Sequence, residues 1–400
     1  IDGVEHRGGQ PDDGGKAKVG HQHTGRSKKG GKGRVGDAGQ QLVEILSHAG
    51  DKAHAGIEAG NDKVKLYLPM DGLKPYNQAT QALVLGEDSP ARRDGRAVTI
   101  QTLGGSGALK VGADFLKKYF PQSDVWVSQP TWENHIAIFQ GSGFEVAEYP
   151  YFDANTNGVA FDEMLTCLKQ IPEQDVVLLH PCCHNPTGAD LTPEQWDQVI
   201  AVLLERNLIP FLDIAYQGFA EDLDKDAYAI RALDRAGAKF LLSNSFSKIF
   251  SLYGERIGGL TAICESSESA EHVLGQFKAT VRKIYSSPPT TGAVLVDTVL
   301  RDDALRLDWQ EELQEMCDRI AKMRTILRDE LTQRVPDRDF SYLVKQRGMF
   351  SYTGLTGEQA DILREEFAIY LLRSGRICVA GLNQKNVYYV AESIAKVLTR

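Results

Sequence analysis

The chain has 400 residues, of which 42% are hydrophobic and 25% charged, and its net charge is −9. This length predicts a large domain and a smaller one rather than a single small core. The negative charge argues against a nucleic-acid partner, and no run of about 18 apolar residues is present that would predict a membrane span.

The start of the chain and its cysteines both bear on where the protein works. The first residues, Ile1-Asp2-Gly3, do not open a charged region followed by an apolar stretch, so no secretory signal is expected. The six cysteines include no C-x-x-C pair, which fits reduced thiols better than a disulfide framework or a zinc site. We therefore expect a cytoplasmic protein that binds no metal.

Residues 1–62 differ in composition from the rest of the chain. Residues 1–60 hold 15 of the 38 glycines and 5 of the 9 histidines, and the first aromatic residue is Tyr67. Such a segment cannot bury enough apolar surface to offset the entropy of ordering it. We expect residues 1–62 to be a disordered tail, or the product of an out-of-frame or truncated upstream reading that joins the remainder near Lys63.

From residue 63 to about 300, short apolar runs alternate with amphipathic stretches. Buried strands are expected at residues 124–128, 176–179, 209–213 and 240–243. The stretch 193–207 has its apolar residues at helical spacing. This alternation predicts an α/β fold, with a mostly parallel sheet covered by helices on both faces. Ligands in such folds bind at the carboxyl ends of the strands, so the loops after the four strands should lie together.

The pattern changes after about residue 300. Residues 304–334 form one long helical pattern, and residues 357–375 form a second that ends at a glycine. We interpret residues 301–400 as a smaller α+β domain that follows a large domain of residues 63–300.

A lysine lies directly after the fourth predicted strand. Lys248 stands among hydroxyl and aromatic residues, and partial desolvation there would lower the pKa of its amine and favour the nucleophilic free base. Ser245 and Arg256 carry the groups needed to hold a phosphate by charge-assisted hydrogen bonds. Taken alone, Lys248 is more simply an ordinary surface lysine; the neighbouring loops overturn that interpretation.

Three further loops carry polar or glycine-rich motifs. Residues 103–109 place glycines at a helix start, where the backbone can approach an anion, although a plain helix-start turn fits equally well. In residues 180–188, Asn-Pro and Thr-Gly mark a tight turn that would present Asn185 to a ligand. Asp213 ends an apolar run, so it needs a cationic or donor partner unless it caps the next helix.

These motifs together resemble those of the class I aspartate and aromatic aminotransferases, from about residue 63 to residue 400. The matching segments are GGSGAL, PTWENH, HPCCHNPTG, DIAYQGF, SFSKIFSLYGERIG, YSSPP and SGRICVAG. The resemblance implies the fold-type I architecture, pyridoxal 5′-phosphate as cofactor, and a homodimer with active sites shared between the subunits. It implies amino acids and 2-oxo acids as the small-molecule substrates.

The resemblance also implies a role for each matching residue. Lys248 would hold the cofactor as a Schiff base and then move a proton at the substrate Cα. Asp213, supported by His135, would keep the ring nitrogen protonated. The other implied cofactor contacts are Tyr216, Asn185 and Trp132 at the ring, and Gly105, Ser106, Ser245 and Arg256 at the phosphate.

Substrate contacts are implied in the same way. Arg376 would clamp the α-carboxylate with its planar fork, next to Trp132 and Asn185. Tyr67 would reach the phosphate from the other subunit, and Arg282, also from that subunit, would meet the distal carboxylate of an acidic substrate.

Three positions resemble the aromatic branch of the family. The chain has Leu66, Ser106 and Ser287, where aspartate-restricted members usually have Asn, Thr and Asn. We therefore expect a transaminase that uses aromatic as well as acidic L-amino acids, with 2-oxoglutarate as the acceptor. Neutral drift at these positions would instead leave an aspartate-restricted enzyme.

Other functions stay open at this point. A lyase or decarboxylase of the same fold is one alternative, but the presence of both Arg376 and Arg282 favours transamination, because two acidic substrates alternate in the site. A cofactor-binding protein made inactive by its unmatched N-terminal segment is another. A nicotinamide-binding protein is disfavoured, because GGSGAL lacks the G-x-G-x-x-G spacing.

Overall fold

The computed structural model describes residues 51–53 and 66–400. All of these described residues belong to one compact unit. The expectation for residues 1–62 therefore lies almost entirely outside the described residues. Within the described ranges, no helix combines the length and the apolar character needed to cross a bilayer.

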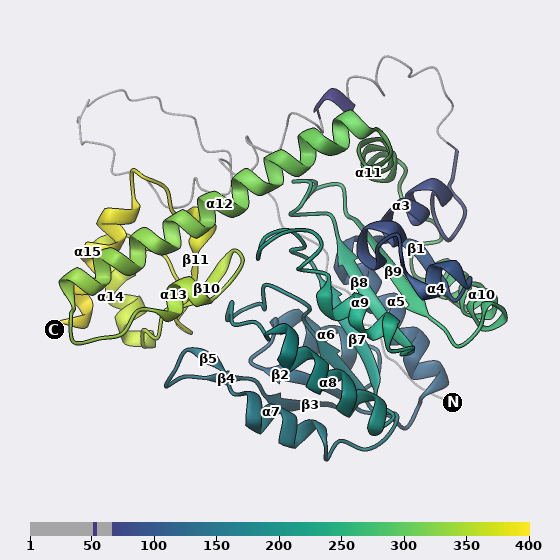
Figure 1. Cartoon of the computed structure of the whole chain (residues 1–400), viewed down its shortest axis with the longest axis horizontal. Coiled ribbons are helices and arrows are strands. Elements are labelled where there is room, and N and C mark those ends of the chain that lie inside the picture. Colours follow the sequence, from purple (N-terminus) through teal and green to yellow (C-terminus); the bar gives the residue numbers. More distant parts are fainter. Residues whose placement is uncertain (1–50, 54–65) are drawn as a thin grey trace, which may run out of the picture. The chain divides into compact units, whose positions relative to one another are not determined.

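A seven-stranded sheet forms the centre of the molecule, in the order β1-β9-β8-β7-β6-β2-β3 (Figure 1). Its strands are β1 (Ala97–Leu103), β2 (Val125–Gln129), β3 (Val146–Pro150), β6 (Val176–Leu179), β7 (Ile209–Ile214), β8 (Phe240–Ser245) and β9 (Ile257–Ile263). The pairs from β3 to β8 are parallel, whereas β9 pairs antiparallel with both β8 and β1. The mostly parallel sheet predicted from the sequence is confirmed, as are its four predicted strands.

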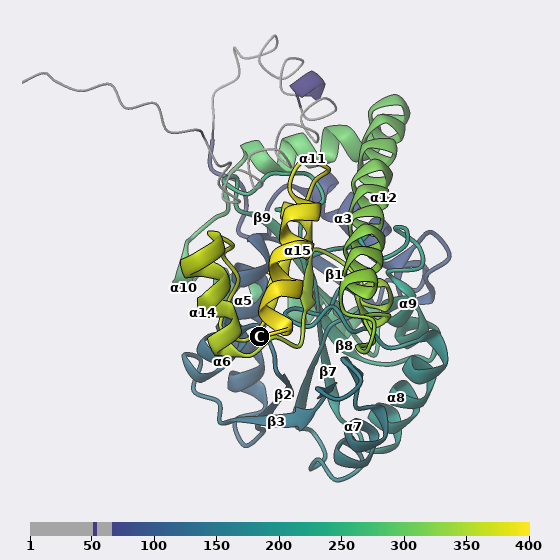
Figure 2. The same ribbon diagram turned by 90° about the vertical axis from the view of Figure 1, so that its left-hand side faces the viewer.

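Helices cover both faces of this sheet because side chains of successive strand residues point to opposite faces. Phe211 packs with α5, α6 and α10 in one buried cluster, and its neighbour Leu212 packs with α7, α8 and α9 in another. Figure 2 shows these two groups of helices on opposite sides of the strands. Their bounds are α5 (Gly104–Tyr119), α6 (Glu133–Gln140), α7 (Phe161–Leu168), α8 (Pro193–Glu205), α9 (Tyr228–Arg235) and α10 (Ser267–Ile284).

The predicted helix at residues 193–207 is confirmed as α8, whose start shows why the sequence folds there. Thr192 accepts a hydrogen bond from the Gln195 amide, and the Gln195 side chain accepts one from the Thr192 amide. This reciprocal pair satisfies two amides that have no partner inside the helix. Smaller elements complete this part of the chain: α3 (Lys74–Leu85), α4 (Pro90–Arg93), β4 (Phe152–Asp153) and β5 (Gly158–Val159).

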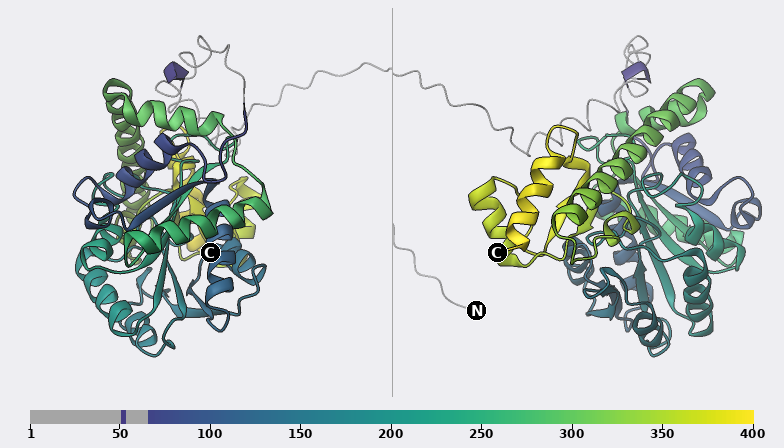
Figure 3. Two further views of the ribbon diagram at one scale, coloured as in Figure 1. Left: turned by 90° about the vertical axis from the view of Figure 1, so that its right-hand side faces the viewer. Right: turned by 60° about the vertical axis from the view of Figure 1, so that its left-hand side comes forward.

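A long helix, α12 (Asp303–Arg334), connects this part to the C-terminal elements (Figures 1 and 3). It packs against α11 (Thr291–Arg301) and against α15 (Val387–Leu398). Near its start, Trp309 stacks on Phe250 and donates its Nε1 hydrogen bond to the Ile249 carbonyl. The remaining elements are α13 (Tyr342–Lys345), β10 (Phe350–Tyr352), α14 (Gly357–Phe367), β11 (Arg376–Cys378) and the short 3-10 helix η2 (Val379–Gly381).

The second helix predicted in this region, residues 357–375, was too long. The helix α14 ends at Phe367 because Ala368 adopts a left-handed conformation, with φ 54°. The amides of Ala368 and Ile369 both donate to the Leu363 carbonyl, and Ile369 is buried. A C-terminal turn of this kind is normally marked by glycine, so the alanine gave no signal in the sequence.

Candidate active site

A pocket of about 320 Å³ lies at the carboxyl ends of β2, β6, β7 and β8, where the sequence placed the ligand. The structure brings together almost every residue singled out from the sequence. Those that line the pocket are Gly105, Ser106, Trp132, His135, Asn185, Asp213, Tyr216, Ser245, Lys248, Arg256 and Arg376. Tyr67 and Arg282 do not line it.

Lys248 reaches the pocket from the turn that follows β8. Its Nζ lies 5.0 Å from the centre of the Tyr216 ring, so the amine faces an aromatic side chain from the loop that follows β7. Burial lowers the pKa of the Lys248 amine, and the Asp213 carboxylate partly opposes this shift. A lowered pKa increases the fraction of free base at neutral pH, which is the form that attacks a carbonyl carbon.

Asp213 stands at the end of β7 and is held from behind by His135. The Nε2 atom of His135 lies 2.9 Å from Asp213 Oδ2, and its Nδ1 lies 2.8 Å from Thr131 Oγ1. Burial alone would raise the pKa of Asp213, but the hydrogen bond and charge of His135 bring it below its ordinary value. Asp213 therefore does not cap a helix; it offers an ionised carboxylate to a cationic group in the pocket.

A second imidazole lies behind this pair. His180 packs edge-on against His135, with ring centres 5.1 Å apart, and its Nε2 lies 3.4 Å from Thr131 Oγ1. Burial lowers the pKa of His180 to about 3, so this ring is neutral at physiological pH. Neutral His180 leaves the negative charge of Asp213 available to the pocket.

The start of α5 and Arg256 form an anion cradle. Gly104 has φ +66°, a conformation that favours glycine, and a Cβ there would lie 2.7 Å from Arg256 Nη2. Gly105 and Ser106 occupy the first turn of α5, where unpaired backbone amides favour negative charge. Ser245, at the end of β8, lies against Gly105. This arrangement has the donors that a phosphate group requires.

Arg376 enters the pocket from β11 with one face covered. Its guanidinium lies 4.6 Å from the centre of the Phe350 ring, and its Nη1 donates a 3.0 Å hydrogen bond to Asn185 Oδ1. The stacked ring and the amide fix the plane of the guanidinium. A fixed planar fork can pair with a carboxylate through two parallel hydrogen bonds.

Tyr67 and Arg282 lie together at a different place on the surface. Both line a hollow of about 940 Å³, together with Leu66 and Ser287. Tyr67 is 96% exposed and Leu66 75% exposed, which is unusual for such large side chains. The described residues of one chain therefore form one pocket that holds the anion cradle and Arg376, and separately expose the two side chains expected to serve a neighbouring subunit.

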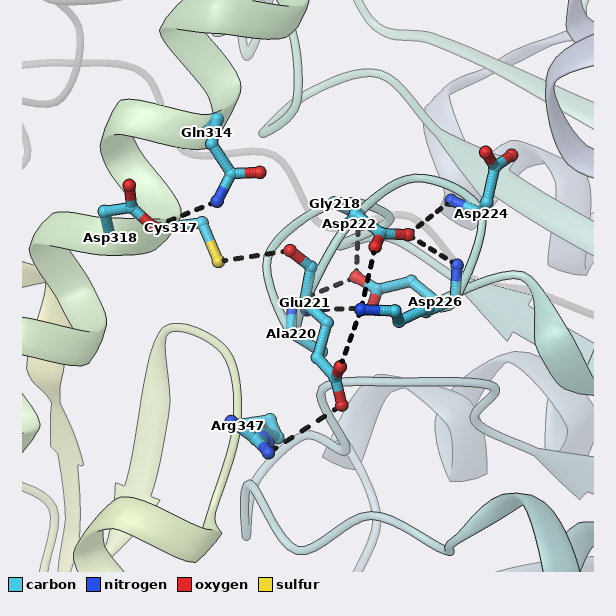
Figure 4. A network of polar contacts seen from close by, with 11 residues as sticks. Gly218, Ala220, Glu221, Asp222, Asp224, Asp226, Gln314, Cys317, Asp318 and Arg347 are labelled. Carbon is cyan, nitrogen blue, oxygen red and sulfur yellow. Dashed lines mark hydrogen bonds and ion pairs between the residues drawn. The ribbon is translucent and has the colours of Figure 1, made fainter.

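Buried carboxylates hold the loops that follow β6 and β7. Asp226 accepts hydrogen bonds from the amides of Gly218, Ala220 and Glu221 at 2.8, 2.9 and 3.0 Å (Figure 4). These amides belong to the loop that begins at Tyr216. Figure 4 also shows Arg347 near Glu221, an ion pair of 3.8 Å. Asp190 holds the loop that follows β6. Its carboxylate accepts hydrogen bonds from the amides of Cys183 and His184 at 2.6 and 2.8 Å.

One group within the described ranges has the spacing of a metal site. The side-chain ligand atoms of Cys182, Cys183 and Asp226 all lie within 4.8 Å of one another. Burial raises the pKa of the Cys183 thiol to about 12, and the hydrogen bond to Cys183 together with burial raises that of Cys182. Metals bind the thiolate form, and Asp226 is already committed to three amides, so the group fits a packed core better than a metal centre.

Asp226 should make the stability of the protein depend on pH. Burial raises its pKa to about 6, above the value of about 3.9 for an unfolded chain. Between about pH 4 and pH 6 the native state therefore holds a proton that the unfolded state releases. The free energy of unfolding should fall as pH rises through this window, by up to about 1.4 kcal/mol per pH unit for this group.

Urea unfolding followed between pH 4 and pH 7 measures this slope. Asp226→Asn should remove its share of the slope, whereas Asp224→Asn, in the same loop but with a side chain 82% exposed, should leave that share in place. An unchanged slope in Asp226→Asn would show that Asp226 is ionised throughout this range.

Several pocket residues were missed by the sequence reasoning. These are His180, Cys182, Ala215, Ser247, Tyr253 and Phe350. His180 and Ser247 lie inside motifs that the sequence did single out, and could have been found there. Phe350 comes from the short strand β10, and its place beside Arg376 follows only from the pairing of β10 with β11.

The residues of the pocket fit pyridoxal phosphate, the cofactor that the sequence resemblance implies. Gly104 adjoins Arg256 at the anion cradle, and the amine of Lys248, whose pKa is lowered by burial, lies in the same pocket. Asp213 supplies a carboxylate whose lowered pKa keeps it ionised opposite a protonated ring nitrogen. An amine, an acid and a phosphate cradle are the groups that this cofactor needs.

Comparison with known proteins agrees with this chemistry. Residues 37–394 match the family model of class I and II aminotransferases, a range that includes residues 37–62, which the motifs did not cover. The chain is 60% identical over 347 residues to an aromatic-amino-acid aminotransferase of Escherichia coli, covering 87% of each chain. It is 48% identical over 337 residues to an aspartate aminotransferase of Haemophilus influenzae, covering 84% of this chain and 85% of the relative.

Solved structures show the same relationship. An aromatic-amino-acid aminotransferase from Burkholderia pseudomallei, described as covalently bound to pyridoxal phosphate, superposes with a TM-score of 0.87. It is 51% identical to this chain, and the match covers 89% of each. The chain therefore belongs to the class I and II aminotransferases and is a pyridoxal-phosphate-dependent transaminase.

Proposed function

We propose that this transaminase moves the amino group of aromatic or acidic L-amino acids to 2-oxoglutarate. The observation that carries the proposal is the higher identity to a relative named for aromatic amino acids, 60%, than to one named for aspartate, 48%. The residues Leu66, Ser106 and Ser287 support the same substrate range. A lyase or an inactive cofactor-binding protein is less consistent with relatives that are named as aminotransferases.

Pyridoxal phosphate, when bound, supplies an electron sink that stabilises negative charge at the substrate Cα. Lys248 would hold the cofactor covalently and would serve as the base that moves the proton at the substrate Cα. Its lowered pKa suits this work near neutral pH. Asp213 holds a proton on the ring nitrogen, and His135 keeps Asp213 oriented through the 2.9 Å hydrogen bond.

The other pocket residues orient the cofactor and the substrate. Tyr216 and Asn185 line the pocket where they would hold the phenolic oxygen of the ring, and Trp132 would cover the face of the ring. Gly105, Ser106, Ser245 and Arg256 hold the phosphate. Arg376 pairs with the substrate α-carboxylate, because its guanidinium is already fixed between Phe350 and Asn185.

Two chains complete each active site in this proposal. Tyr67 is 96% exposed and lies with Arg282 outside the pocket of its own chain. In a homodimer, Tyr67 would reach the phosphate held by the partner subunit, and Arg282 would reach the distal carboxylate of the substrate bound there. Burial in the dimer would also explain the apolar side chain of Leu66, which is 75% exposed in one chain.

We further propose that residues 63–300 form the cofactor-binding domain and residues 301–400 a smaller domain that supplies Arg376. All six cysteines are free thiols, which supports a reducing compartment, and we propose the cytoplasm.

The substrate range gives the direct test of the proposal. Leucine at position 66 makes the entrance apolar, and burial of a substrate ring there contributes about 25 cal/mol per Å². We expect phenylalanine and tyrosine to be used as well as aspartate. The measurement is the ratio of kcat/KM for phenylalanine to that for aspartate. A ratio below about one in a thousand, equivalent to some 4 kcal/mol of discrimination, would identify an aspartate-restricted enzyme.

Arg282→Ala should separate the two substrate classes. Loss of a hydrogen bond to a charged group costs about 1.5–3 kcal/mol, so kcat/KM for aspartate should fall by roughly 10- to 150-fold. Phenylalanine has no distal carboxylate and should be nearly unaffected. Lys283→Ala is the matched control, because Lys283 is the next residue of α10 and is exposed. An equal loss for both substrates in Arg282→Ala would assign Arg282 a structural role.

A further inference from the structure

A buried glutamine lies behind the hollow that contains Tyr67 and Arg282. Gln101 is fully buried on β1, the edge strand of the sheet. Its side-chain oxygen accepts a 3.1 Å hydrogen bond from the Leu73 amide, and its side-chain nitrogen donates a 2.6 Å hydrogen bond to the Pro289 carbonyl. One side chain thereby bonds two segments that are far apart in the sequence.

One of these segments carries Tyr67, and the other directly follows Arg282. Tyr67 and Arg282 are the two residues offered to the neighbouring subunit. The first, residues 66–73, begins with Leu66 and Tyr67 and is called the Tyr67 segment. The second, residues 285–290, follows Arg282 at the end of α10, contains Ser287, and is called the Ser287 segment. Arg282 is joined to it by a 2.9 Å hydrogen bond from Nη1 to Ser286 Oγ. Both segments line the 940 Å³ hollow.

The contact between Gln101 and the Tyr67 segment is close. The Gln101 amide donates a 2.9 Å hydrogen bond to the Asp71 carbonyl. Gly72 has φ +88°, and a Cβ there would lie 2.2 Å from Gln101 Cβ, so a side chain at position 72 would push the segment off the strand. The glutamine and this glycine therefore fix the height of the segment above β1.

We infer that Gln101 is a positioning residue that sets the spacing between Tyr67 and Arg282, so that the two side chains enter the partner's active site as one unit. The inference rests on the shared site proposed above. Tyr67 serves the phosphate and Arg282 the distal carboxylate, so a change in the spacing should weaken both contacts together. Gln101 itself does not line the pocket that contains Lys248.

Gln101→Met tests this role, because methionine has a similar length but can make neither hydrogen bond. The control is Thr99→Val, which removes the buried 2.8 Å hydrogen bond between Thr99 and Thr261 on the same strand. Hydrogen exchange at the Leu73 amide should be faster by about tenfold in Gln101→Met, and unchanged in Thr99→Val. This readout needs neither cofactor nor substrate.

Hybrid dimers then show on which subunit Gln101 acts. In one hybrid, a Gln101→Met chain is paired with a Lys248→Ala chain, so the single working site takes Tyr67 and Arg282 from a chain with intact Gln101. In the other hybrid, an unchanged chain is paired with a chain carrying both substitutions, so the working site takes them from a chain without Gln101. We expect normal kcat/KM per site in the first hybrid. In the second, kcat/KM for aspartate and the affinity for pyridoxal phosphate should each fall about tenfold.

Two outcomes would overturn the inference while leaving the shared site intact. Equal loss in both hybrids would make Gln101 a general structural residue, and no loss in either would make it dispensable. Gly72→Ala, which disturbs the same contact from the other side, should behave as Gln101→Met does and covers the case in which one variant folds poorly. A hybrid of Tyr67→Phe with Lys248→Ala checks the shared site itself. A monomer by light scattering would overturn both the shared site and this inference.

Discussion

Lys248→Ala should abolish transamination while leaving the fold intact. Without the amine, the chain cannot bind the cofactor covalently and has no base at the substrate Cα. A positioned base contributes roughly 10²- to 10⁴-fold, and loss of the covalent link adds to this. We expect kcat to fall by about a thousandfold or more, and the absorbance of the covalently bound cofactor to disappear and not to return when pyridoxal phosphate is added.

The folded state should tolerate this change, because burial of the charged amine costs more than its attraction to Asp213 returns. Burial lowers its pKa, so the surroundings disfavour the charged form. The thermal unfolding midpoint should therefore stay within a few degrees of that of the unchanged protein. Lys239→Ala, at an exposed lysine just before β8, is the matched control and should keep full activity. Normal turnover by Lys248→Ala would remove Lys248 from the mechanism.

Arg376→Lys should raise KM for every amino acid substrate. Lysine keeps the charge but cannot make two parallel hydrogen bonds, and it loses the stacking on Phe350 at 4.6 Å. Loss of one charge-assisted hydrogen bond costs about 1.5–3 kcal/mol, so kcat/KM should fall by roughly 10- to 150-fold. Unlike Arg282→Ala, this variant should affect phenylalanine and aspartate to the same degree.

The comparison of the two substrates therefore distinguishes the roles of the two arginines. Arg373→Lys provides the control, because Arg373 is 67% exposed and pairs with Asp361 on the surface. It should change neither kinetic constant. If Arg376→Lys impaired only acidic substrates, Arg376 would contact the distal carboxylate instead of the α-carboxylate.

The sequence predicted the core of this fold because its central strands are continuous apolar runs. Strands such as β6 and β7 are covered on both faces, and their almost wholly apolar sequences indicate this burial. The strands β1 and β9 were not predicted. β9 contains two adjacent glycines and β1 contains threonines and a glutamine. Their order beside β8 follows from tertiary pairing, which no local pattern shows.

In the candidate site too, some residues could be predicted from local sequence patterns and others depend on tertiary structure. Residues in loops after predicted strands, such as Lys248 and Asp213, could be found because parallel strands bring their carboxyl ends to one edge. Phe350 and Gln101 could not be found in this way. Phe350 depends on how β10 and β11 lie against the pocket, and Gln101 on two segments that meet only in the folded chain. A buried glutamine in a strand looks the same in sequence whether it serves the core or a site.

The antiparallel strand β9 has a consequence for how this enzyme can change. Because β9 runs back from the edge where β1 and β8 end, three neighbouring strands meet at the phosphate cradle: β1 leads into Gly105, β8 ends at Ser245, and β9 begins just after Arg256. The register of the sheet thus fixes the relative positions of Gly105, Ser245 and Arg256. Leu66 and Ser287 lie outside the sheet, on the two segments that Gln101 joins to its edge strand, and Arg282 lies on α10. We therefore expect substitutions at these positions to change the substrate range more readily than substitutions at the anion cradle do.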